Sequence, residues 1–181
     1  ALEGGMIECL AQAVTPHFQS GLFDSLTEVT FDKVDKTKML EMFSQQNECV
    51  KFVKENDGVL DPAPVMAVGN IESWLQALVE GMQESIRSTI KMANEAVFEK
   101  ELEEFIFGFP AQIALLGIQF LWTNDMQTAL TGAKKDKSMM VKAFKKQETL
   151  LKEMIVITTR PDLDKNDRKN LETVITVHVH Q

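Results

Sequence analysis

Two short stretches of the chain carry residue types that could bind a nucleotide or a metal ion. The first, Gly132-Ala-Lys-Lys-Asp-Lys-Ser138, is the nearest match to a phosphate-binding loop. Such a loop needs two glycines at fixed spacing before Lys-Ser/Thr, so that backbone N–H groups can surround phosphates at the start of a helix. This stretch lacks the second glycine and follows an expected helix rather than a strand. We therefore predict that it binds no nucleotide.

The second stretch is the histidine pair His178 and His180. On a strand the two imidazoles would point to one face and could share a metal ion, whereas on a helix they diverge by roughly 200°. The sequence signals no third ligand, since the only other histidine is His17. We expect one partly buried and one exposed histidine, and no metal site.

The remaining reactive residues form no recognisable catalytic set. Serine, cysteine and histidine show no nucleophile–base arrangement. Trp74 and Trp122 occur on apolar helical faces, where core packing is expected, and each indole N–H needs an acceptor if it is buried. A solvated helix face explains the densest run of carboxylates, which consists of Glu99, Glu101, Glu103 and Glu104. We predict no catalytic, cofactor-binding or metal-binding residue, and so no enzyme, in this chain.

The acidic balance of the chain argues against two classes of partner. The formal net charge is −8. A field of that sign repels nucleic acid and anionic membranes, so we expect neither as a partner. One segment has the opposite sign, and a solvated helix face is the favoured explanation of its lysines: Lys134, Lys135, Lys137, Lys142, Lys145 and Lys146.

Cysteines and apolar runs indicate a soluble protein of a reducing compartment. Cys9 and Cys49 form no CxxC or zinc-type spacing, which suits a reducing cytosol better than a disulfide framework. Residues 1–6 have neither the basic head nor the apolar stretch of a secretory signal. The most apolar run, Ala111–Trp122, is shorter than the roughly 18–20 residues of a bilayer span and predicts a buried helix.

Alternating apolar residues between Val29 and Val53 predict a small antiparallel β meander that is solvated on one face. Gln45–Glu48 supplies the turn between its last two strands, and Asn47 is the residue best able to adopt a positive φ. Short helices are expected before the meander, at Met6–Ala13 and Pro16–Leu26. The expected face partners are Val29 with Phe31, Leu40 with Met42, and Val50 with Phe52.

A turn-forming segment follows the meander. Asp57-Gly58 and Asp61-Pro62-Ala63-Pro64 bias the backbone towards turns or extended conformations, because proline lacks a backbone donor. We place a subdomain boundary here, between residues 1–64, with short helices and the meander, and residues 65–181, with a helical bundle. By composition, Asp61–Pro64 is a candidate compliant connection between the two.

Helical periodicity then continues to the end of the chain. Asn70 is a good N-cap for a first long helix, and a second is expected at about Glu95–Phe107, ending near Gly108. Pro110 is well placed to open a third, which runs to about Leu130 and is central because it is apolar nearly all round. The first helix is expected to bury Ile71, Trp74, Leu75, Leu78, Val79, Met82, Ile86 and Ile90.

A fourth helix is expected from Lys137 or Ser138 to about Thr159, and a fifth begins near Asp164. Residues 173–180 alternate as a strand would, yet they also fit a helical face; we favour helix because it continues the preceding pattern. The predicted fold is mostly α, an antiparallel helical bundle with a small antiparallel β meander near the N-terminus. The fourth helix is expected to bury Met140, Phe144, Leu151, Met154 and Ile155.

Three stretches, in order along the chain, together resemble one known family. Val68–Leu75 is similar to a Gly-Asn-Val-Glu-x-Trp-Leu segment of dynein heavy chains, and Phe109–Asn124 to a stretch of them in which Pro-x-Gln is followed by Gln-x-x-Trp-Thr. Leu171–Gln181 resembles the helix that ends the dynein linker, just before the first AAA+ module. Met6–Val53 also aligns, with Ser44-Gln-Gln-Asn-Glu48 where the family has Ser-Gln-Glu-Gly-Glu; asparagine tolerates the left-handed backbone that glycine adopts. The Phe-Pro-Ala-Gln and Val-His-Val-His-Gln segments are most similar to axonemal, outer-arm chains.

The resemblance implies a mechanical role without catalysis. In dyneins the linker is a rod of helical bundles that crosses a ring of AAA+ modules and bends and straightens as ATP turns over, producing movement along a microtubule. The implied partner is the AAA+ ring of the same heavy chain. ATP, Mg²⁺, microtubules and other dynein subunits would be bound by regions outside this segment. The implied location is the cytoplasmic cytoskeleton, in the axoneme of a cilium or flagellum. An alternative is a helical adaptor or scaffold that shares only the bundle periodicity.

Overall fold

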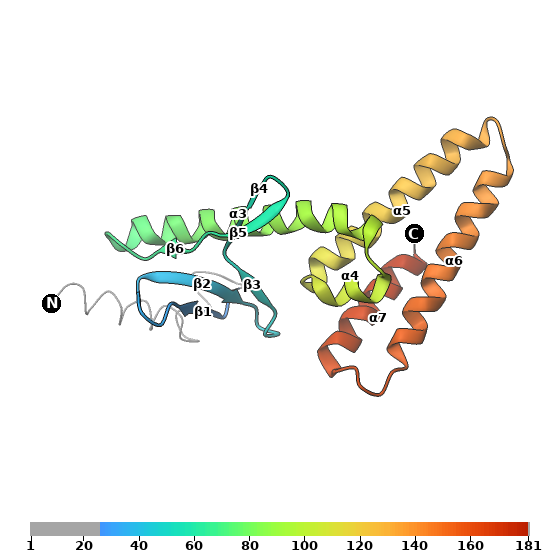
Figure 1. Cartoon of the computed structure of the whole chain (residues 1–181). Coiled ribbons are helices and arrows are strands. Elements are labelled where there is room, and N and C mark those ends of the chain that lie inside the picture. The colour runs from blue at the N-terminus through green and yellow to red at the C-terminus, as the bar shows by residue number, and fades with distance from the viewer. Residues whose placement is uncertain (1–25, 181) are drawn as a thin grey trace. The chain divides into compact units, whose positions relative to one another are not determined.

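The computed structural model describes residues 26–180, which form strands β1–β6 and helices α3–α7 (Figure 1). The chain divides into two compact units, Ala1–Met92 and Ala93–Gln181. The expected short helices before the meander, together with Cys9 and His17, lie outside the described residues. The predicted fold class is confirmed: the described residues are mostly helical, with small antiparallel sheets near the N-terminal end.

The predicted meander is present in the first unit. Strands β1 (Glu28–Phe31), β2 (Lys38–Phe43) and β3 (Cys49–Lys51) pair antiparallel in that order, and β6 (Val65–Met66) pairs with the start of β2. The turn between β2 and β3 is also as predicted, since Asn47 has a φ of 61°. The Ser44 hydroxyl stabilises this turn by accepting the N–H groups of Gln46 and Glu48.

One face of β2 differs from the prediction. Thr30 pairs with Glu41, but the next residue, Phe31, pairs with Met39, so Leu40 is an extra residue on β2. Such a bulge interrupts the two-residue alternation of side chains. As a result Met39 and Met42 are both buried while Leu40 is only half-buried. The predicted pairing of Leu40 with Met42 on the buried face was wrong for this reason.

The turn-forming segment before the expected boundary forms a second hairpin. Strands β4 (Val53–Asn56) and β5 (Val59–Pro62) pair antiparallel across Asp57 and Gly58, whose φ angles are 48° and 81°. Positive φ at both central residues is the signature of a two-residue hairpin turn. The strands are short, charged and mostly exposed, so their apolar alternation was too weak to predict them. The division at residues 64 and 65 stays a prediction.

The core of the first unit lies between the sheet and helix α3 (Ile71–Glu99). Helix α3 begins as predicted, because the Asn70 side chain accepts the Ser73 N–H at 3.0 Å. It approaches the strands closely at Gly81, where a Cβ atom would lie 2.2 Å from Val65 Cγ2. The buried cluster consists of Leu26, Val29, Met39, Met42, Phe52, Val65, Ala67, Trp74 and Leu78.

Helix α3 is longer than predicted. It continues to Glu99, and the break lies at Lys100 and Glu101, after which α4 (Leu102–Gly108) ends where expected. No glycine or proline interrupts residues 91–99, and the buried stripe simply continues through Ala93, Ala96 and Val97. The predicted helix at Glu95–Phe107 was therefore wrong in its start. Ile71 and Ile86, expected to be buried, are exposed.

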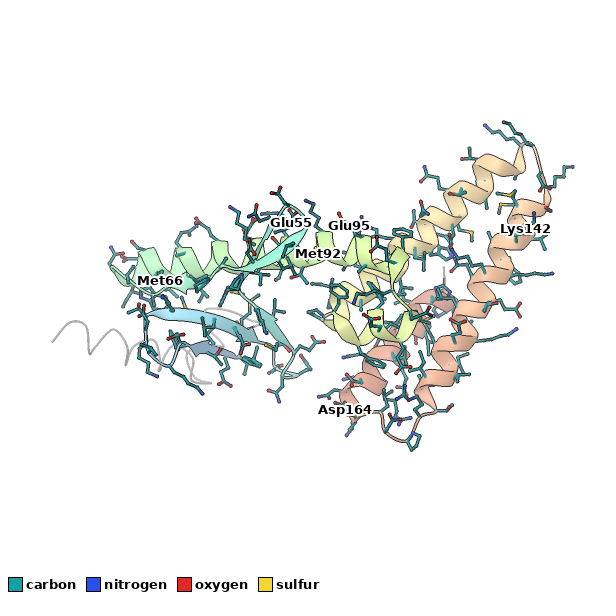
Figure 2. All side chains as sticks on the ribbon, in the orientation of Figure 1. Glu55, Met66, Met92, Glu95, Lys142 and Asp164 are labelled. Atoms are coloured by element: carbon teal, nitrogen blue, oxygen red, sulfur yellow. The ribbon has the colours of Figure 1, made fainter. Side chains whose placement is uncertain are left out.

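The second unit is built around helix α5 (Ala111–Ala133), which contacts α4, α6 (Ser138–Thr158) and α7 (Lys165–Val179). The predicted central position of α5 is confirmed. Residues 173–179 are helical, as favoured, and the Asp164 side chain caps α7 by accepting the Asn166 and Asp167 N–H groups. Figure 2 shows Asp164 at the start of this helix. Buried apolar residues here include Ile113, Ala114, Ile118, Leu121, Met154, Ile157, Leu171 and Val174.

Helix α6 turns a different face to the core than predicted. Of the five residues expected to be buried, Met154 is buried, Leu151 is half-buried, and Met140, Phe144 and Ile155 are exposed. The face that packs inward consists of Ala143, Gln147, Met154 and Ile157. Helix α6 has two apolar stripes on neighbouring faces, and the periodicity of one helix cannot tell which one its neighbours will cover.

Gly117 allows a close contact between α4 and α5. A Cβ atom at Gly117 would lie 2.3 Å from Cζ of Phe105, a ring that is almost completely buried. We expect Gly117→Ala to lower the free energy of unfolding, because overpacking costs about 1–3 kcal/mol, more than the ~1 kcal/mol that alanine gains in helix propensity. Urea unfolding followed by circular dichroism measures this. Gly108→Ala is the control, since nothing lies within 4 Å of its added methyl; equal effects of the two substitutions would contradict the packing argument.

Candidate functional site

The stretch nearest to a phosphate-binding loop forms the turn between α5 and α6. The Gly132 carbonyl accepts the N–H groups of Lys135 and Asp136 at 2.9 and 3.0 Å, which closes α5. The Asp136 carboxylate accepts the N–H and hydroxyl of Ser138 at 2.9 and 2.7 Å, and these bonds lower the pKa of Asp136. The backbone N–H groups that a phosphate would need are thus engaged in ending one helix and starting the next. That no nucleotide binds here stays a prediction.

The two histidines near the C-terminal end lie on different faces of α7. His178 is buried, and its Nε2 lies 3.4 Å from the Gln147 carbonyl oxygen on α6. His180 is exposed at the end of the helix. The expected arrangement of one buried and one exposed histidine is confirmed. Within residues 26–180, no group of three His, Cys, Asp or Glu side chains is placed to hold a metal ion.

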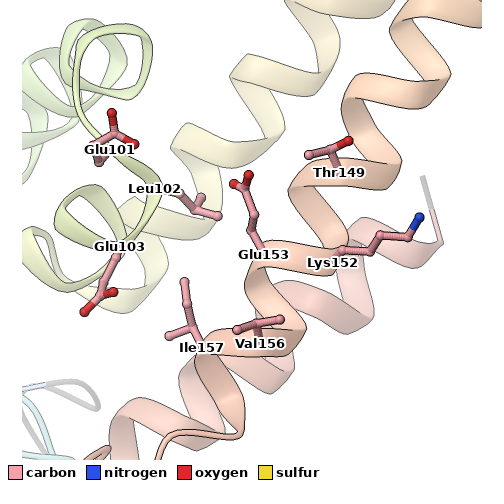
Figure 3. A pocket seen from close by; sticks show the side chains of 8 residues that line it. All are labelled: Glu101, Leu102, Glu103, Thr149, Lys152, Glu153, Val156 and Ile157. Carbon is pink, nitrogen blue, oxygen red and sulfur yellow. The ribbon is translucent and has the colours of Figure 1, made fainter.

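The glutamates after α3 differ in their surroundings. Glu103 pairs with Arg160 and Glu104 with Lys100, so these two carboxylates neutralise cations rather than only facing solvent. Glu101 and Glu103 lie together with Glu153 around an open pocket between α4 and α6, with a volume of about 450 Å³ (Figure 3). Leu102, Val156 and Ile157 provide its apolar part. The pocket could accept a small apolar group beside a cation.

A polar contact joins α5 to α6. The Asp125 carboxylate accepts Lys146 Nζ at 2.8 Å and Gln147 Nε2 at 2.7 Å. Gln147 is buried, and its Oε1 finds no partner among the described residues. Because an amide buried without bonds is costly, the bond to Asp125 fixes how the two helices align along their length. No local pattern in the sequence predicts this contact, because it joins residues about twenty positions apart.

Hydroxyl groups attach the β4–β5 hairpin to α3. In the hairpin register, the N–H groups of Lys54 and Asn56 point to β5, so those of Val53 and Glu55 point away from it. Ser85 Oγ accepts the Val53 N–H at 3.1 Å, and Ser88 Oγ accepts the Glu55 N–H at 3.0 Å. Both serines are buried. Two hydroxyls three positions apart on one helix face thus complete an otherwise open strand edge.

An ion pair reinforces the same contact. Lys91 Nζ lies 2.7 Å from Glu55 Oε2, and Gly58 N–H donates to the other oxygen of that carboxylate. Figure 2 shows Glu55 on the hairpin beside α3. The hydrogen bond from Lys91, which has the larger effect, and the one from Gly58 together hold the pKa of Glu55 below its ordinary value of 4.5. Serines at positions 85 and 88, on a helix face where apolar residues were expected, are the sequence signal that could have revealed the contact.

The two tryptophans have different environments. Trp74 is buried in the first unit as expected, but its indole N–H has no hydrogen-bond partner among the described residues. Trp122 is only half-buried, so the prediction that it packs in the core was wrong in extent.

Cys49 is an exposed residue, but its thiol is partly desolvated, and this raises the pKa of the thiol. No helix within the described part of the chain has the length and apolar character needed to cross a bilayer.

Helix α6 exposes several apolar side chains along one side. We call Met140, Val141, Phe144, Leu151 and Ile155 the α6 stripe. Phe144 is 67% exposed, Val141 55%, Ile155 46% and Met140 36%. Side chains at this spacing lie along one side of a helix. Contiguous exposed apolar side chains usually mark a surface that binds another protein segment.

Comparison with known proteins gives one consistent result. A family described as "Dynein heavy chain, N-terminal region 2" matches residues 7–93. The chain is 57% identical over 169 residues to the dynein gamma chain of the flagellar outer arm of Chlamydomonas reinhardtii. It is 40% identical over 182 residues to dynein axonemal heavy chain 5 of Mus musculus, and 37% over 183 residues to dynein axonemal heavy chain 8 of Homo sapiens. These alignments cover 93%, 97% and 97% of the chain, but only 4% of each relative.

Removing one hydroxyl should loosen the hairpin. We expect Ser88→Ala to leave the Glu55 N–H without a partner, to lower the free energy of unfolding by about 1–2 kcal/mol, and to speed amide hydrogen exchange at Glu55. Ser73→Ala is the matched control, because Ser73 is exposed near the start of the same helix. Unchanged exchange at Glu55 in Ser88→Ala would mean that the bond contributes nothing to holding β4.

The Glu55–Lys91 ion pair should make stability depend on pH. A carboxyl whose pKa is lowered in the folded state stabilises it above the unfolded-state value near 4.5, and this contribution disappears as pH falls through the lower folded value. We expect Glu55→Gln to be less stable than the native chain at pH 7, and the difference to vanish well below pH 4.5. Unfolding at a series of pH values measures it, with Glu95→Gln, at an exposed position of the helix that carries Lys91, as the control. A difference that is constant with pH would exclude the ion pair as its source.

Proposed function

Because this chain belongs to the dynein heavy chain family and is similar to one short segment of its relatives, we propose that it is a mechanical element of the linker of such a motor. It transmits conformational change of the ATP-driven AAA+ ring into movement along a microtubule and carries out no catalysis itself. The observation that supports this most directly is the 57% identity to a flagellar outer-arm dynein over 93% of the chain.

The physical character of the second unit suits such a role. Helix α5 is covered by three other helices, and α5 and α6 are bound through buried Gln147 and Asp125. Close-packed helices resist compression and change between discrete arrangements rather than deforming continuously. In the first unit, the hairpin is bonded to α3 by backbone, hydroxyl and ionic groups together. Both units therefore have the stiffness that transmission of force requires.

The proposal assigns nucleotide chemistry to other parts of the heavy chain. ATP and Mg²⁺ would bind outside these residues, and this segment would act on the AAA+ ring of its own heavy chain. Microtubules and other dynein subunits would be contacted by regions beyond it. The named relatives are flagellar or axonemal, which supports a place in the axoneme of a cilium or flagellum.

A core substitution in the full-length heavy chain tests the mechanical role. Leu171 is completely buried in the second unit, and truncating such a side chain costs about 2–5 kcal/mol. We expect Leu171→Ala to reduce microtubule gliding velocity several-fold while basal ATPase activity persists, because the nucleotide sites lie elsewhere. Glu172→Ala, at the exposed neighbouring position, should leave both rates unchanged.

Two results would contradict the proposal. Loss of ATPase activity in proportion to velocity would assign this segment to the catalytic cycle rather than to transmission. Native velocity in Leu171→Ala, at a temperature where circular dichroism of the isolated chain shows the substitution to be destabilising, would mean that the fold of this segment is not needed for movement.

A further inference from the structure

The α6 stripe has a composition that solvent exposure does not explain. Phe144 and Val141 are more than half exposed, and Met140 and Ile155 lie beside them on the same helix. The inward face of α6 is already complete without these residues, since Ala143, Gln147, Met154 and Ile157 fill it. A helix with a second apolar face beside its buried one has a surface that remains to be covered.

The length and spacing of the stripe are suited to packing against a second helix. From Met140 to Ile155 it extends about 22 Å at the ~1.5 Å rise of an α-helix. Val141, Phe144, Leu151 and Ile155 occupy positions separated by three, seven and four residues, which is the alternation used when two helices pack along each other. Glu148 lies in the gap between Phe144 and Leu151, where it pairs with Lys152 at 2.8 Å. A partner helix would bury the apolar residues on both sides of this ion pair.

The charges around the stripe indicate the sign of the charge that the partner carries. Residues 134–152 contain seven lysines and two carboxylates, in a chain whose net charge is −8. Helical spacing places Lys145 and Lys152 along one edge of the stripe, and Figure 2 shows Lys142 near the same end of α6 as the turn from α5. Charges at the edge of an apolar interface select partners of opposite sign and suppress like-charged ones. The complementary partner therefore carries carboxylates beside its own apolar face.

The size of the stripe indicates where this partner comes from. Stable complexes between separate proteins bury about 20–30 residues a side, whereas the stripe offers five. A contact this small is adequate when both surfaces belong to one chain, because tethering gives effective concentrations on the order of millimolar. The relatives extend far beyond this segment, which covers 4% of their length. A helix of the same heavy chain is thus the source that the size of the surface favours.

We propose that the α6 stripe is the docking surface for an acidic amphipathic helix from another part of the same heavy chain. This inference rests on the proposed function, because it supposes that the segment works within a full-length heavy chain. It assigns the lysines at the edge of the stripe a binding role in place of simple solvation. It also accounts for the exposure of Met140, Phe144 and Ile155, which the sequence pattern had placed in a core.

Site-specific photo-cross-linking in the full-length heavy chain tests the proposal. A benzophenone amino acid replaces Phe144, and in a matched protein it replaces Val156, which is 64% exposed on the same helix but outside the stripe. We expect position 144 to cross-link within the heavy chain to one peptide rich in Asp, Glu and apolar residues, and position 156 not to cross-link to it. No cross-link at 144, equal cross-links at both positions, or a cross-link only to a different protein or to lipid would overturn the proposal.

Charge reversal tests the acidic character separately. We expect Lys145→Glu with Lys152→Glu to reduce the yield of the cross-link from position 144 several-fold, and Lys169→Glu, at an exposed position of α7, to leave it unchanged. An unaltered yield in the double variant would overturn the charge assignment. Gliding velocity and ATPase activity, measured on the same proteins, keep the two proposals distinct. A specific cross-link together with native velocity in Leu171→Ala would count against the mechanical role alone, whereas loss of velocity in Leu171→Ala without any cross-link would count against the docking surface alone.

Discussion

The second unit depends on one constraint: the N-terminal half of helix α5 is apolar on nearly every side and must be packed on several sides at once. No single neighbouring helix can do this, so α4, α6 and α7 each contact it. Their arrangement follows from where α5 permits close approach. Gly117 leaves room for the Phe105 ring of α4, and Asp125 offers a carboxylate to Gln147 of α6. Apolar coverage supplies most of the stabilisation, while these two contacts select one arrangement among the many that would bury a similar area.

The first unit solves a different problem, that of an open strand edge. Backbone N–H groups on one side of β4 have no neighbouring strand, and unsatisfied N–H groups are costly wherever water is excluded. Helix α3 meets this need with Ser85 and Ser88 rather than with apolar side chains. The consequence is that α3 has a mixed inner face, apolar near Trp74 and Leu78 and hydroxylic further along. A hairpin that would be marginal alone is held in this way by a helix distant in sequence.

Local signals in the sequence were sufficient to predict much of this architecture. Asn47, Asn70 and Asp164 act within a few residues of themselves, and their turn and caps were readable from residue type and spacing. Errors arose where the outcome depends on contacts between distant residues. The bulge at Leu40 reflects pairing with β1, the serines of α3 serve β4, and the inward face of α6 is chosen by α5 and α7. The candidate surface was visible in the sequence as an apolar stripe, but only the structure shows that it faces outward.

The contact of Gly117 with Phe105 limits how such a segment can vary over time. A side chain at position 117 would overlap the Phe105 ring, so a larger residue at 117 is accommodated best when the residue at 105 becomes smaller. Exposed charges such as Glu172 carry no comparable restriction. Two chains of this kind could therefore differ at most of their surface and still share this pair, and a smaller residue at 105 would be the expected companion of any larger residue at 117. Covariation between these two positions would record the closeness of α4 and α5 even where overall identity has become low.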